Sequence, residues 1–378
     1  MNRLTQGLIK LNNEVKVLAM NTPNNFVDLA AIQKSYTAST NIEAVYIDTS
    51  IKIPDAFFNL FSDKSYNIQR FISPAFDAAL KKILSGSKFD IIQLESLFVV
   101  PYLNTIKNLS DAKIVLRAHN VEYEIWERRY RACTNPVKKA YLKLLAGRLK
   151  EYETTHLNEY DGIAAITSRD AEIFKLTGCR LPITDIPVGI DVDAMSQDIL
   201  QKPKLPLSIF HLGSMDWMPN QEAVHWFITK VWQDLKKENP ELKLYLAGKN
   251  MPDWILEIND DNIIAEGEIK DAFKYMADKH IMIVPILSGS GMRVKIIEGM
   301  FLGKVIISTP IGAEGICYEN RKTILIAGDK KEFIKLINEC VGNPDLCKEI
   351  GLNARALAIK EYDNNMICQK LIDFYNTL

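Results

Sequence analysis

The chain lacks the features that mark disulfide scaffolds, cysteine metal sites, membrane spans and nucleic-acid binders. Its six cysteines are scattered and none forms a Cys-x-x-Cys pair, which argues against a patterned disulfide or metal framework. No apolar run approaches the ~18–20 residues that a bilayer span needs, and the N-terminus has no continuous signal-peptide core. Lysine plus arginine number 46 and aspartate plus glutamate 47, so the net charge of -1 does not indicate nucleic-acid binding. These absences favour a cytoplasmic protein with reduced thiols.

What the chain does contain is an ordinary globular composition and a repeated strand–helix pattern. Its 378 residues suggest two domains, at roughly 100–200 residues for each. Strands that alternate with helices predict parallel sheets with right-handed crossovers. The expected strands are 15–20, 44–48, 89–95, 113–119 and 162–167 in the first half, and 208–213, 242–248, 263–267, 281–286 and 304–309 in the second. We therefore predict an α/β protein with two Rossmann-like domains whose parallel sheets face a cleft.

A polar stretch with three prolines, residues 187–207, separates the two halves. We accordingly predict an N-terminal domain over residues 1–187, a linker over 188–207 and a C-terminal domain over 208–360. Residues 361–378 are expected to form a C-terminal helix, because a break near 362–364 separates them from the helix before. The two predicted domains are similar in size and in pattern.

The segment 281–316 carries the strongest chemical signal of the chain. It contains a buried strand, a Gly289–Ser290–Gly291 loop, a helix with Arg293, Lys295 and Glu298, and a second buried strand. This order places a glycine-rich loop and a helix N-terminus at the carboxyl end of a parallel strand. Backbone N–H groups and the helix dipole both favour negative charge at such a position. Two cations beside the loop indicate a diphosphate.

The run GSGMRVKIIEGMFLGKVIISTPIGAEGI resembles the signature of the retaining GT-B glycosyltransferases of the large group 1, or family 4, type. The resemblance implies that Glu298 accepts hydrogen bonds from the ribose hydroxyls of a nucleotide-sugar donor. Ser290 stands where the family usually has an acid that contacts the transferred sugar. Arg293 and Lys295 would neutralise the diphosphate leaving group, with no metal and no further cofactor. The alternative is that Lys295 and Glu298, three residues apart, form an ordinary surface pair.

Three further positions belong to the implied donor site. Gly213 follows the first strand of the second half and would let the backbone approach a phosphate, although a simple strand–turn–helix with Asn220 near the helix start fits nearly as well. The resemblance places the backbone of Ile269 at the nucleotide base, which leaves uridine and guanosine open. Thr309 would lie near the phosphates, or would be a turn residue before Pro310.

A second motif, LRAHNVEYEIWERR, resembles the family branch in which a strand ends in His-Asn-x-Glu. His119 would then face the donor sugar and bind a hydroxyl or help to move a proton. The alternative is a structural histidine that caps Glu122 or the helix after it. We do not expect His119 to be a nucleophile.

Residues 127–153 hold eight Lys/Arg against three Glu. The helix that begins near Pro136 is expected to have one apolar face, made of Val137, Tyr141, Leu144, Leu145 and Leu149. A basic amphipathic helix is typical of peripheral membrane contact at the inner face of a membrane, and the resemblance implies a lipid-linked acceptor there. A solvated helix packed on the sheet is the alternative.

Family members begin with a strand and a glycine loop, whereas this chain begins within the helix that follows them. A gap in a buried sheet leaves backbone hydrogen bonds unmade, so we expect lowered or absent activity. The function expected is transfer of a hexose from a nucleotide diphosphate sugar to a glycan or lipid-linked acceptor, with retention, in cell-surface polysaccharide synthesis. The alternatives are a nucleotide-sugar-binding protein without transfer activity and a nucleotide-sugar epimerase of the same fold.

Overall fold

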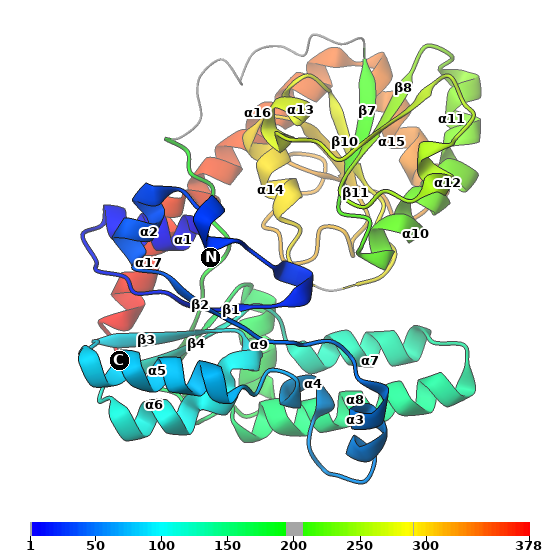
Figure 1. Ribbon diagram of the computed structural model, residues 1–378. Coiled ribbons are helices and arrows are strands. Elements are labelled where there is room, and N and C mark those ends of the chain that lie inside the picture. The colour runs from blue at the N-terminus through cyan, green and yellow to red at the C-terminus, as the bar shows by residue number, and fades with distance from the viewer. Residues whose placement is uncertain (1, 194–206, 290) are drawn as a thin grey trace. The chain divides into compact units, whose positions relative to one another are not determined.

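A computed structural model describes residues 2–193, 207–289 and 291–378 (Figure 1). The chain divides into two compact units. Unit 1 contains residues 1–187 together with 365–378, and unit 2 contains residues 188–364. The last residues of the chain, which the sequence analysis treated as a separate C-terminal helix, thus belong to the same unit as the first. None of the helices in the described ranges is both long and apolar enough to cross a bilayer.

Unit 1 contains two parallel sheets. A two-stranded sheet has the order β1-β2, and a four-stranded sheet has the order β3-β4-β5-β6. Within the described residues, β1 therefore pairs only with β2 and β3 only with β4. The strands are β1 (Leu18–Asn21), β2 (Glu43–Tyr46), β3 (Ile91–Glu95), β4 (Lys113–Ala118), β5 (Gly162–Ala165) and β6 (Ile183–Asp185). The sequence pattern missed β6, which has only three residues.

The helices of unit 1 cover both faces of the four-stranded sheet. They are α1 (Asn2–Lys10), α2 (Lys34–Thr40), α3 (Ile53–Asn59), α4 (Tyr66–Gln69), α5 (Pro74–Gly86), α6 (Leu103–Leu109), α7 (Glu122–Ala132), α8 (Pro136–Thr155), α9 (Ser168–Leu176) and α17 (Asn364–Tyr375). Strand β4 shows the alternation that this arrangement demands. Ile114 and Leu116 point into one core, with side chains of α5, α6 and α8, and Val115 points into the other, with Leu4 of α1 and Leu371 of α17.

Unit 2 is built on one parallel six-stranded sheet with the order β12-β11-β10-β7-β8-β9. Its strands are β7 (Ser208–Leu212), β8 (Lys243–Ala247), β9 (Ile263–Gly267), β10 (Ile281–Val284), β11 (Val305–Ser308) and β12 (Leu325–Ile326). Its helices are α10 (Met218–Trp226), α11 (Gln233–Glu238), α12 (Asp253–Leu256), α13 (Ala272–Ala277), α14 (Val294–Phe301), α15 (Lys330–Gly342) and α16 (Pro344–Tyr362). A π-helical turn over Phe227–Trp232 joins α10 to α11.

Both faces of this sheet are buried, as the apolar strands require. On β7, Ile209 packs into a core with Trp232 and Phe333, while its neighbour Phe210 packs into a second core with Met300 of α14. The predicted fold class is therefore confirmed as α/β with parallel sheets. All ten expected strands are present, with ends that differ from those predicted by up to three residues, and β12 is an addition.

Candidate functional site

The order of strands in unit 2 reverses between β7 and β10. The chain leaves β7 toward β8 on one side and returns to β10 on the other. Loops that leave the carboxyl ends of two such strands diverge, and open α/β sheets bind ligands in the crevice that results. Gly213 follows β7, and Gly289 and Gly291 follow β10. The topology thus brings the glycines of two separate sequence motifs to one switch point.

The two loops at this switch point touch each other. A Cβ atom on Gly289 would lie 2.6 Å from Cζ2 of Trp217, which comes from the loop after β7. The guanidinium carbon of Arg293 lies 4.9 Å from the centroid of the same indole, a distance at which a cation and an aromatic face attract. Ser288 also donates to the Glu222 carboxylate of α10 at 2.9 Å. No larger residue fits at Gly289 without displacing Trp217.

Two close contacts hold the loop after β7, one between the backbones of Gly213 and Gly248 and one between Gly213 and the side chain of Asn220. A Cβ on Gly248 would lie 1.7 Å from the carbonyl oxygen of Gly213, and a Cβ on Gly213 would lie 2.6 Å from Nδ2 of Asn220. Asn220 in turn donates to the carbonyl of Ser214 at 2.7 Å. Glycine is therefore required at both positions by space alone, and Asn220 fixes the loop rather than the helix end.

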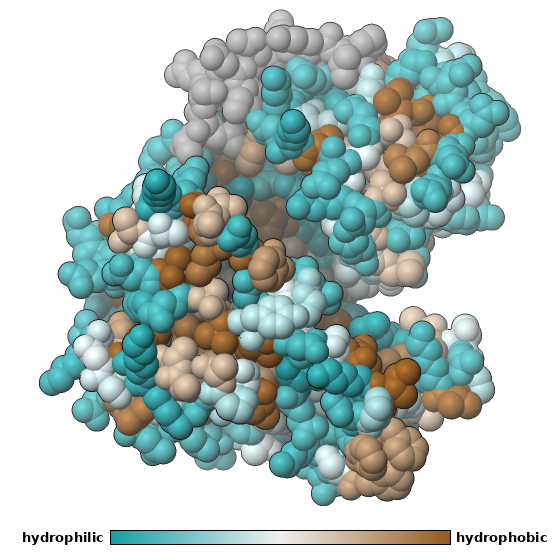
Figure 2. Space-filling model, viewed as in Figure 1, coloured by the Kyte–Doolittle hydropathy of each residue, from teal (hydrophilic) through white to brown (hydrophobic). Residues whose placement is uncertain are grey.

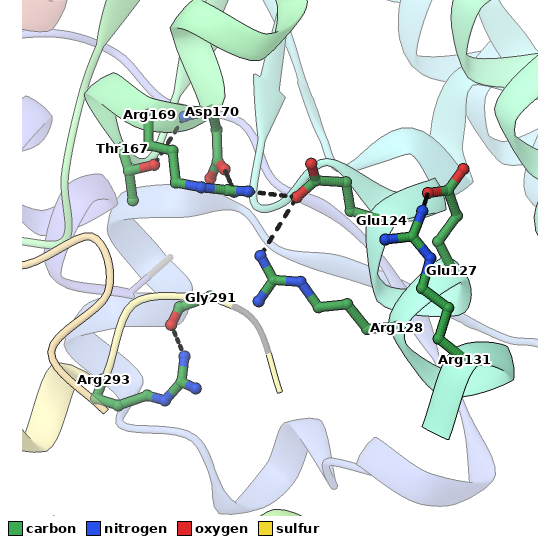
Figure 3. A network of polar contacts seen from close by, with 9 residues as sticks. All are labelled: Glu124, Glu127, Arg128, Arg131, Thr167, Arg169, Asp170, Gly291 and Arg293. Atoms are coloured by element: carbon green, nitrogen blue, oxygen red, sulfur yellow. Dashed lines mark hydrogen bonds and ion pairs between the residues drawn. The ribbon is translucent and has the colours of Figure 1, made fainter. Parts of the chain in front are cut away.

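Helix α14 presents the predicted cations at its start. Arg293 is the residue before the first turn, not a residue within the helix as the sequence analysis placed it. Its Nη1 donates to the carbonyl of Gly291, so the side chain bends back over the glycine loop (Figure 3). Gly291 adopts a φ of 89°, which side-chain-bearing residues rarely tolerate. The loop therefore places a guanidinium beside backbone that can approach a ligand closely.

Lys295 and Glu298 form an ion pair of 2.6 Å, but the two side chains differ in exposure. The lysine is 40% exposed and the glutamate 4%. An ordinary surface pair would leave both groups in water, whereas burial of a carboxylate is costly unless it is paired. The buried Glu298 therefore fits a built site better than the surface-pair alternative.

The remaining predicted donor residues are placed as follows. Ile269 lies in the loop after β9 and is partly buried against the core of α14. Thr309 follows β11, and its hydroxyl donates to the carbonyl of Ile286 and accepts from the N–H of Gly312 at 2.9 Å. These bonds tie the loop after β10 to the loop after β11. They are consistent with the alternative in which Thr309 is a turn residue before Pro310. Ser290 lies outside the described residues.

In unit 1, His119 lies directly after β4 and meets an acid from the neighbouring strand. Its Nε2 is 2.6 Å from Oε2 of Glu95, the last residue of β3. Glu95 is in register with Arg117, and residues two apart on a strand point to the same face, so all three side chains gather on one side of the sheet. The other carboxylate oxygen of Glu95 accepts from Gln93 at 2.6 Å. The sequence analysis did not identify Glu95.

The charge of Glu95 is maintained in a half-buried position. Burial alone raises the pKa of this carboxyl, but the hydrogen bond from His119 and the charge of Arg117 outweigh it, so the pKa is lowered. The Nε of Arg117 is 3.8 Å from the same Glu95 oxygen that His119 contacts. Glu95 is therefore a carboxylate that fixes one ring nitrogen of His119.

The backbone beside this pair is strained. Ser96, which follows Glu95, has a φ of 90° and a ψ of 162°, a conformation essentially restricted to glycine. Its hydroxyl accepts from the N–H of Phe98 at 3.3 Å. Strain of this kind persists where the surrounding structure holds it, and it is concentrated at functional sites.

A buried acid of α8, and not His119, caps helix α7. Glu153 accepts from the backbone N–H groups of Glu122 and Tyr123 at 3.1 and 3.0 Å. His119 therefore does not cap α7, which was the structural role considered as the alternative for it. Burial raises the pKa of Glu153 to about 8 and that of Glu122 to about 7, because burial disfavours the charged forms.

The raised pKa of Glu153 predicts a loss of stability as the pH rises from about 4.5 to about 8. The folded protein holds the proton up to about pH 8, whereas the unfolded chain releases it near pH 4.5, so the free energy of unfolding falls as the pH rises between these values. The limit for one group is about 1.4 kcal/mol per pH unit. Glu153→Gln mimics the protonated acid and should flatten this fall in urea titrations between about pH 5 and pH 8. Glu151→Gln, exposed on the same helix, should not. Parallel curves for wild type and Glu153→Gln would contradict the assignment.

An ion-pair network ties α7 to α9 near the carboxyl ends of β4 and β5. Arg169 donates to Glu124 at 2.7 Å and to Asp170 at 3.2 Å, while Arg128 reaches the same Glu124 oxygen at 3.5 Å (Figure 3). The hydroxyl of Thr167 accepts from the N–H of Asp170 at 3.0 Å. The helices that follow β4 and β5 are therefore tied to each other.

The residues predicted to form one apolar face of α8 lie in two environments. Leu145 and Leu149 are buried, together with Leu142 and Ala146, but Val137 and Leu144 are exposed. On a helix with 3.6 residues per turn, positions 137, 141 and 144 lie about a quarter-turn away from 142, 145 and 149. The apolar residues of α8 therefore form two neighbouring stripes, one buried and one exposed.

Known proteins resemble this chain in the sequence of its second unit and in its overall fold. Residues 206–343 match the family model described as "Glycosyl transferases group 1". An uncharacterised 44.6 kDa protein in the cps region of Klebsiella pneumoniae is 25% identical over 299 residues, which cover 76% of this chain and 74% of that protein.

Solved structures support the fold over the full length. Sucrose-phosphate synthase from Thermosynechococcus elongatus superimposes with a TM-score of 0.71 at 15% identity, covering 99% of this chain and 91% of that one. Anabaena HepE, in complex with UDP and glucose, gives 0.66 at 14% identity, with 96% and 100% covered. A glycosyltransferase from Rickettsia africae gives 0.63 at 16% identity, with 97% and 98% covered. The chain thus has the GT-B glycosyltransferase fold, and residues 206–343 match the model of the group 1 glycosyltransferases.

Proposed function

We propose that the protein transfers a hexose from a nucleotide diphosphate sugar to a glycan or lipid-linked acceptor, with retention of configuration at the anomeric carbon. The observation that carries this proposal is the switch point of unit 2. There the loops after β7 and β10 meet through Trp217 and Gly289, beside Arg293 and the buried Glu298. The group 1 family match over the same residues supports it.

The polar groups at this switch point suit the two ends of a nucleoside diphosphate. Glu298 is acceptor-only when ionised and can take two ribose hydroxyls. The guanidinium of Arg293 and the ammonium of Lys295 would face the diphosphate, with the backbone of Gly213, Gly289 and Gly291 beside it. HepE, a structural neighbour, is described with UDP and with UDP-glucose, which makes uridine the first base to test.

The reaction places its largest developing charge on the leaving group. The bond from the anomeric carbon to the diphosphate oxygen breaks, the acceptor oxygen forms the new bond on the same face, and the acceptor proton must leave. Arg293 and Lys295 would stabilise the negative charge that develops on the diphosphate, in place of a metal. His119, oriented by Glu95, would bind a hydroxyl of the sugar or of the acceptor and would not form a covalent bond.

For the acceptor we propose only a chemical class, a glycan or a lipid-linked acceptor. A relative encoded in a cps region favours a role in cell-surface polysaccharide synthesis. Such an acceptor, when lipid-linked, is presented at a membrane. We therefore propose a cytoplasmic location with peripheral contact at the inner face of the membrane.

The first test of this function is donor binding. A ligand at ~100 times its Kd stabilises a protein by roughly 2.7 kcal/mol, so the Tm should rise with one of UDP, GDP and ADP. Glu298→Ala should abolish the rise, because it removes the ribose acceptor. The control Glu319→Ala, an exposed glutamate of the same unit that pairs with Lys322, should keep it.

The outcomes separate three readings of the site. A rise in Tm with one nucleotide that is lost in Glu298→Ala, together with sugar transfer, supports the proposal. A shift without any transfer to glycan or lipid-linked acceptors would identify a nucleotide-sugar-binding protein. The absence of a shift with all three nucleotides would show that the switch point of unit 2 is not a donor site.

A further inference from the structure

One segment of unit 1 exposes large apolar side chains that a folded surface usually hides. Six of them fall between residues 51 and 61, on α3 and its flanks. They are Ile51, Ile53, Phe57, Phe58, Leu60 and Phe61, which we call the α3 apolar patch. Phe57, Phe58 and Phe61 are exposed by 56%, 71% and 80%. A contiguous apolar patch on a surface marks a site of interaction.

The three phenylalanine rings form one cluster. Phe57 makes edge-on contacts with Phe58, at 6.0 Å between ring centroids, and with Phe61, at 5.6 Å. Apolar colours gather where α3 lies in the space-filling view (Figures 1 and 2). The rings therefore pack on one another and point outward together, as a single protrusion that could enter an apolar medium.

The patch is anchored to the basic helix α8. Arg148 donates to the carbonyls of Asn59 and Leu60 at 2.8 and 3.1 Å, and also reaches the Asn59 side chain. The end of α3 is thus held against the middle of α8. Val137 and Leu144, the two exposed residues of the predicted apolar face, lie on the same stripe of α8 as Arg148. The apolar surface continues along the helix toward its start.

The charge of α8 is of one sign over most of its length. From Pro136 to Lys150 it contains five Lys/Arg and no acid, and Lys138, Lys139 and Lys143 are exposed. Near the patch itself, Lys52 and Lys64 offset Asp55 and Asp63, so the net positive charge comes from α8. Basic side chains beside exposed aromatic ones are the two signals that peripheral binding to an anionic bilayer requires.

We propose that the α3 apolar patch and α8 together form a docking surface for an anionic lipid bilayer. Phe57, Phe58 and Phe61 would insert below the headgroups, and Lys138, Lys139 and Lys143 would contact lipid phosphates. This inference rests on the proposed peripheral location and specifies its surface and its lipid class. A protein partner would bury the rings equally well, but the excess of positive charge favours anionic lipid.

The test is co-sedimentation of the full chain with vesicles. We expect binding to vesicles of equal parts phosphatidylcholine and phosphatidylglycerol, little binding to phosphatidylcholine alone, and weaker binding as salt screens the charges. The triple variant Phe57→Ser, Phe58→Ser, Phe61→Ser should bind anionic vesicles at least about tenfold more weakly. Lys138→Gln, Lys139→Gln, Lys143→Gln should lower binding to the anionic vesicles only. Leu176→Ser, which removes an equally exposed apolar side chain of the same unit (79% exposed), is the matched control.

The outcomes separate this inference from the catalytic one. Equal vesicle binding by wild type and the phenylalanine variant would overturn it, as would failure of wild type to bind while the nucleotide-dependent Tm shift is intact. A wild-type dimer that the phenylalanine variant converts to a monomer would assign the patch to a second copy of the chain and would also overturn it. The removed side chains are exposed, so the variants are expected to keep the wild-type Tm.

Discussion

Arg293→Ala is expected to lower kcat for sugar transfer by about 10²–10³-fold. Removal of one preorganised donor to a charge that develops in the transition state typically has this effect. Arg293 is held over the glycine loop by Trp217 on one side and by the Gly291 carbonyl on the other. Because the charge on the leaving group grows as the bond breaks, KM for the donor should change much less than kcat.

Arg293→Lys separates charge from shape. Lysine keeps the positive charge but cannot stack on the Trp217 indole as a planar guanidinium does, so its activity should lie between those of wild type and alanine. Arg321→Ala, which removes a guanidinium paired with Glu339 elsewhere in the same unit, should leave kcat unchanged. Steady-state kinetics with the donor selected by the Tm screen measures all three. A rise in KM at constant kcat would show that Arg293 binds the ground state and the transition state equally well, and would contradict this prediction.

Glu95→Gln is expected to lower kcat by about 10²-fold, in the range ascribed to a positioned acid–base group. Glu95 accepts from His119 at 2.6 Å, and a carboxylate can only accept, so it fixes which ring nitrogen carries the proton. A glutamine has nearly the same shape but can present its NH2 group to the histidine. The orientation and the protonation of His119 are then no longer defined by its neighbour.

A double-mutant cycle tests this positioning role. If Glu95 acts through His119, the variant that carries both Glu95→Gln and His119→Ala should be no slower than His119→Ala alone. The Tm shift with nucleotide should be the same in all variants, because the donor residues lie in unit 2. Glu95→Gln also leaves the buried Arg117 without the carboxylate that lies 3.8 Å from its Nε, so unfolding is measured in parallel and rates are compared well below every Tm. Additive losses in the cycle would show that Glu95 acts independently of His119.

The fold was predictable because its signals are local. The central strands β10 and β11 are short apolar runs, residues 281–284 and 305–308, that are buried on both faces, so the runs are continuous instead of alternating. The two strands that were missed, β6 and β12, have three and two residues. Runs so short have no periodicity to detect.

The candidate site was predictable only where it is contiguous in sequence. The glycine loop and the cations of α14 lie within ten residues of one another. Glu95 and His119 are 24 residues apart, and their contact depends on the register of β3 with β4, which the sequence pattern does not specify. Trp217 is likewise separated from Arg293 by three strands of chain. The only local signal for Trp217 was that an aromatic residue follows Gly213, the glycine at the end of β7.

The last helix has a consequence for how the protein is made. Unit 2 is continuous in sequence, whereas one core of unit 1 combines Leu4, Val115 and Ala164 with Ile367, Cys368 and Leu371 of α17. A Cβ on Gly162 would lie 2.8 Å from the ring of Phe374, so α17 packs directly on the sheet. During synthesis on the ribosome, unit 1 therefore cannot complete this core until residues 365–378 have been made. Unit 2 is made after most of unit 1 but can complete its core before unit 1 does. Until then an apolar sheet face of unit 1 is uncovered, which makes the nascent chain a client for chaperones that hold extended or partly folded segments.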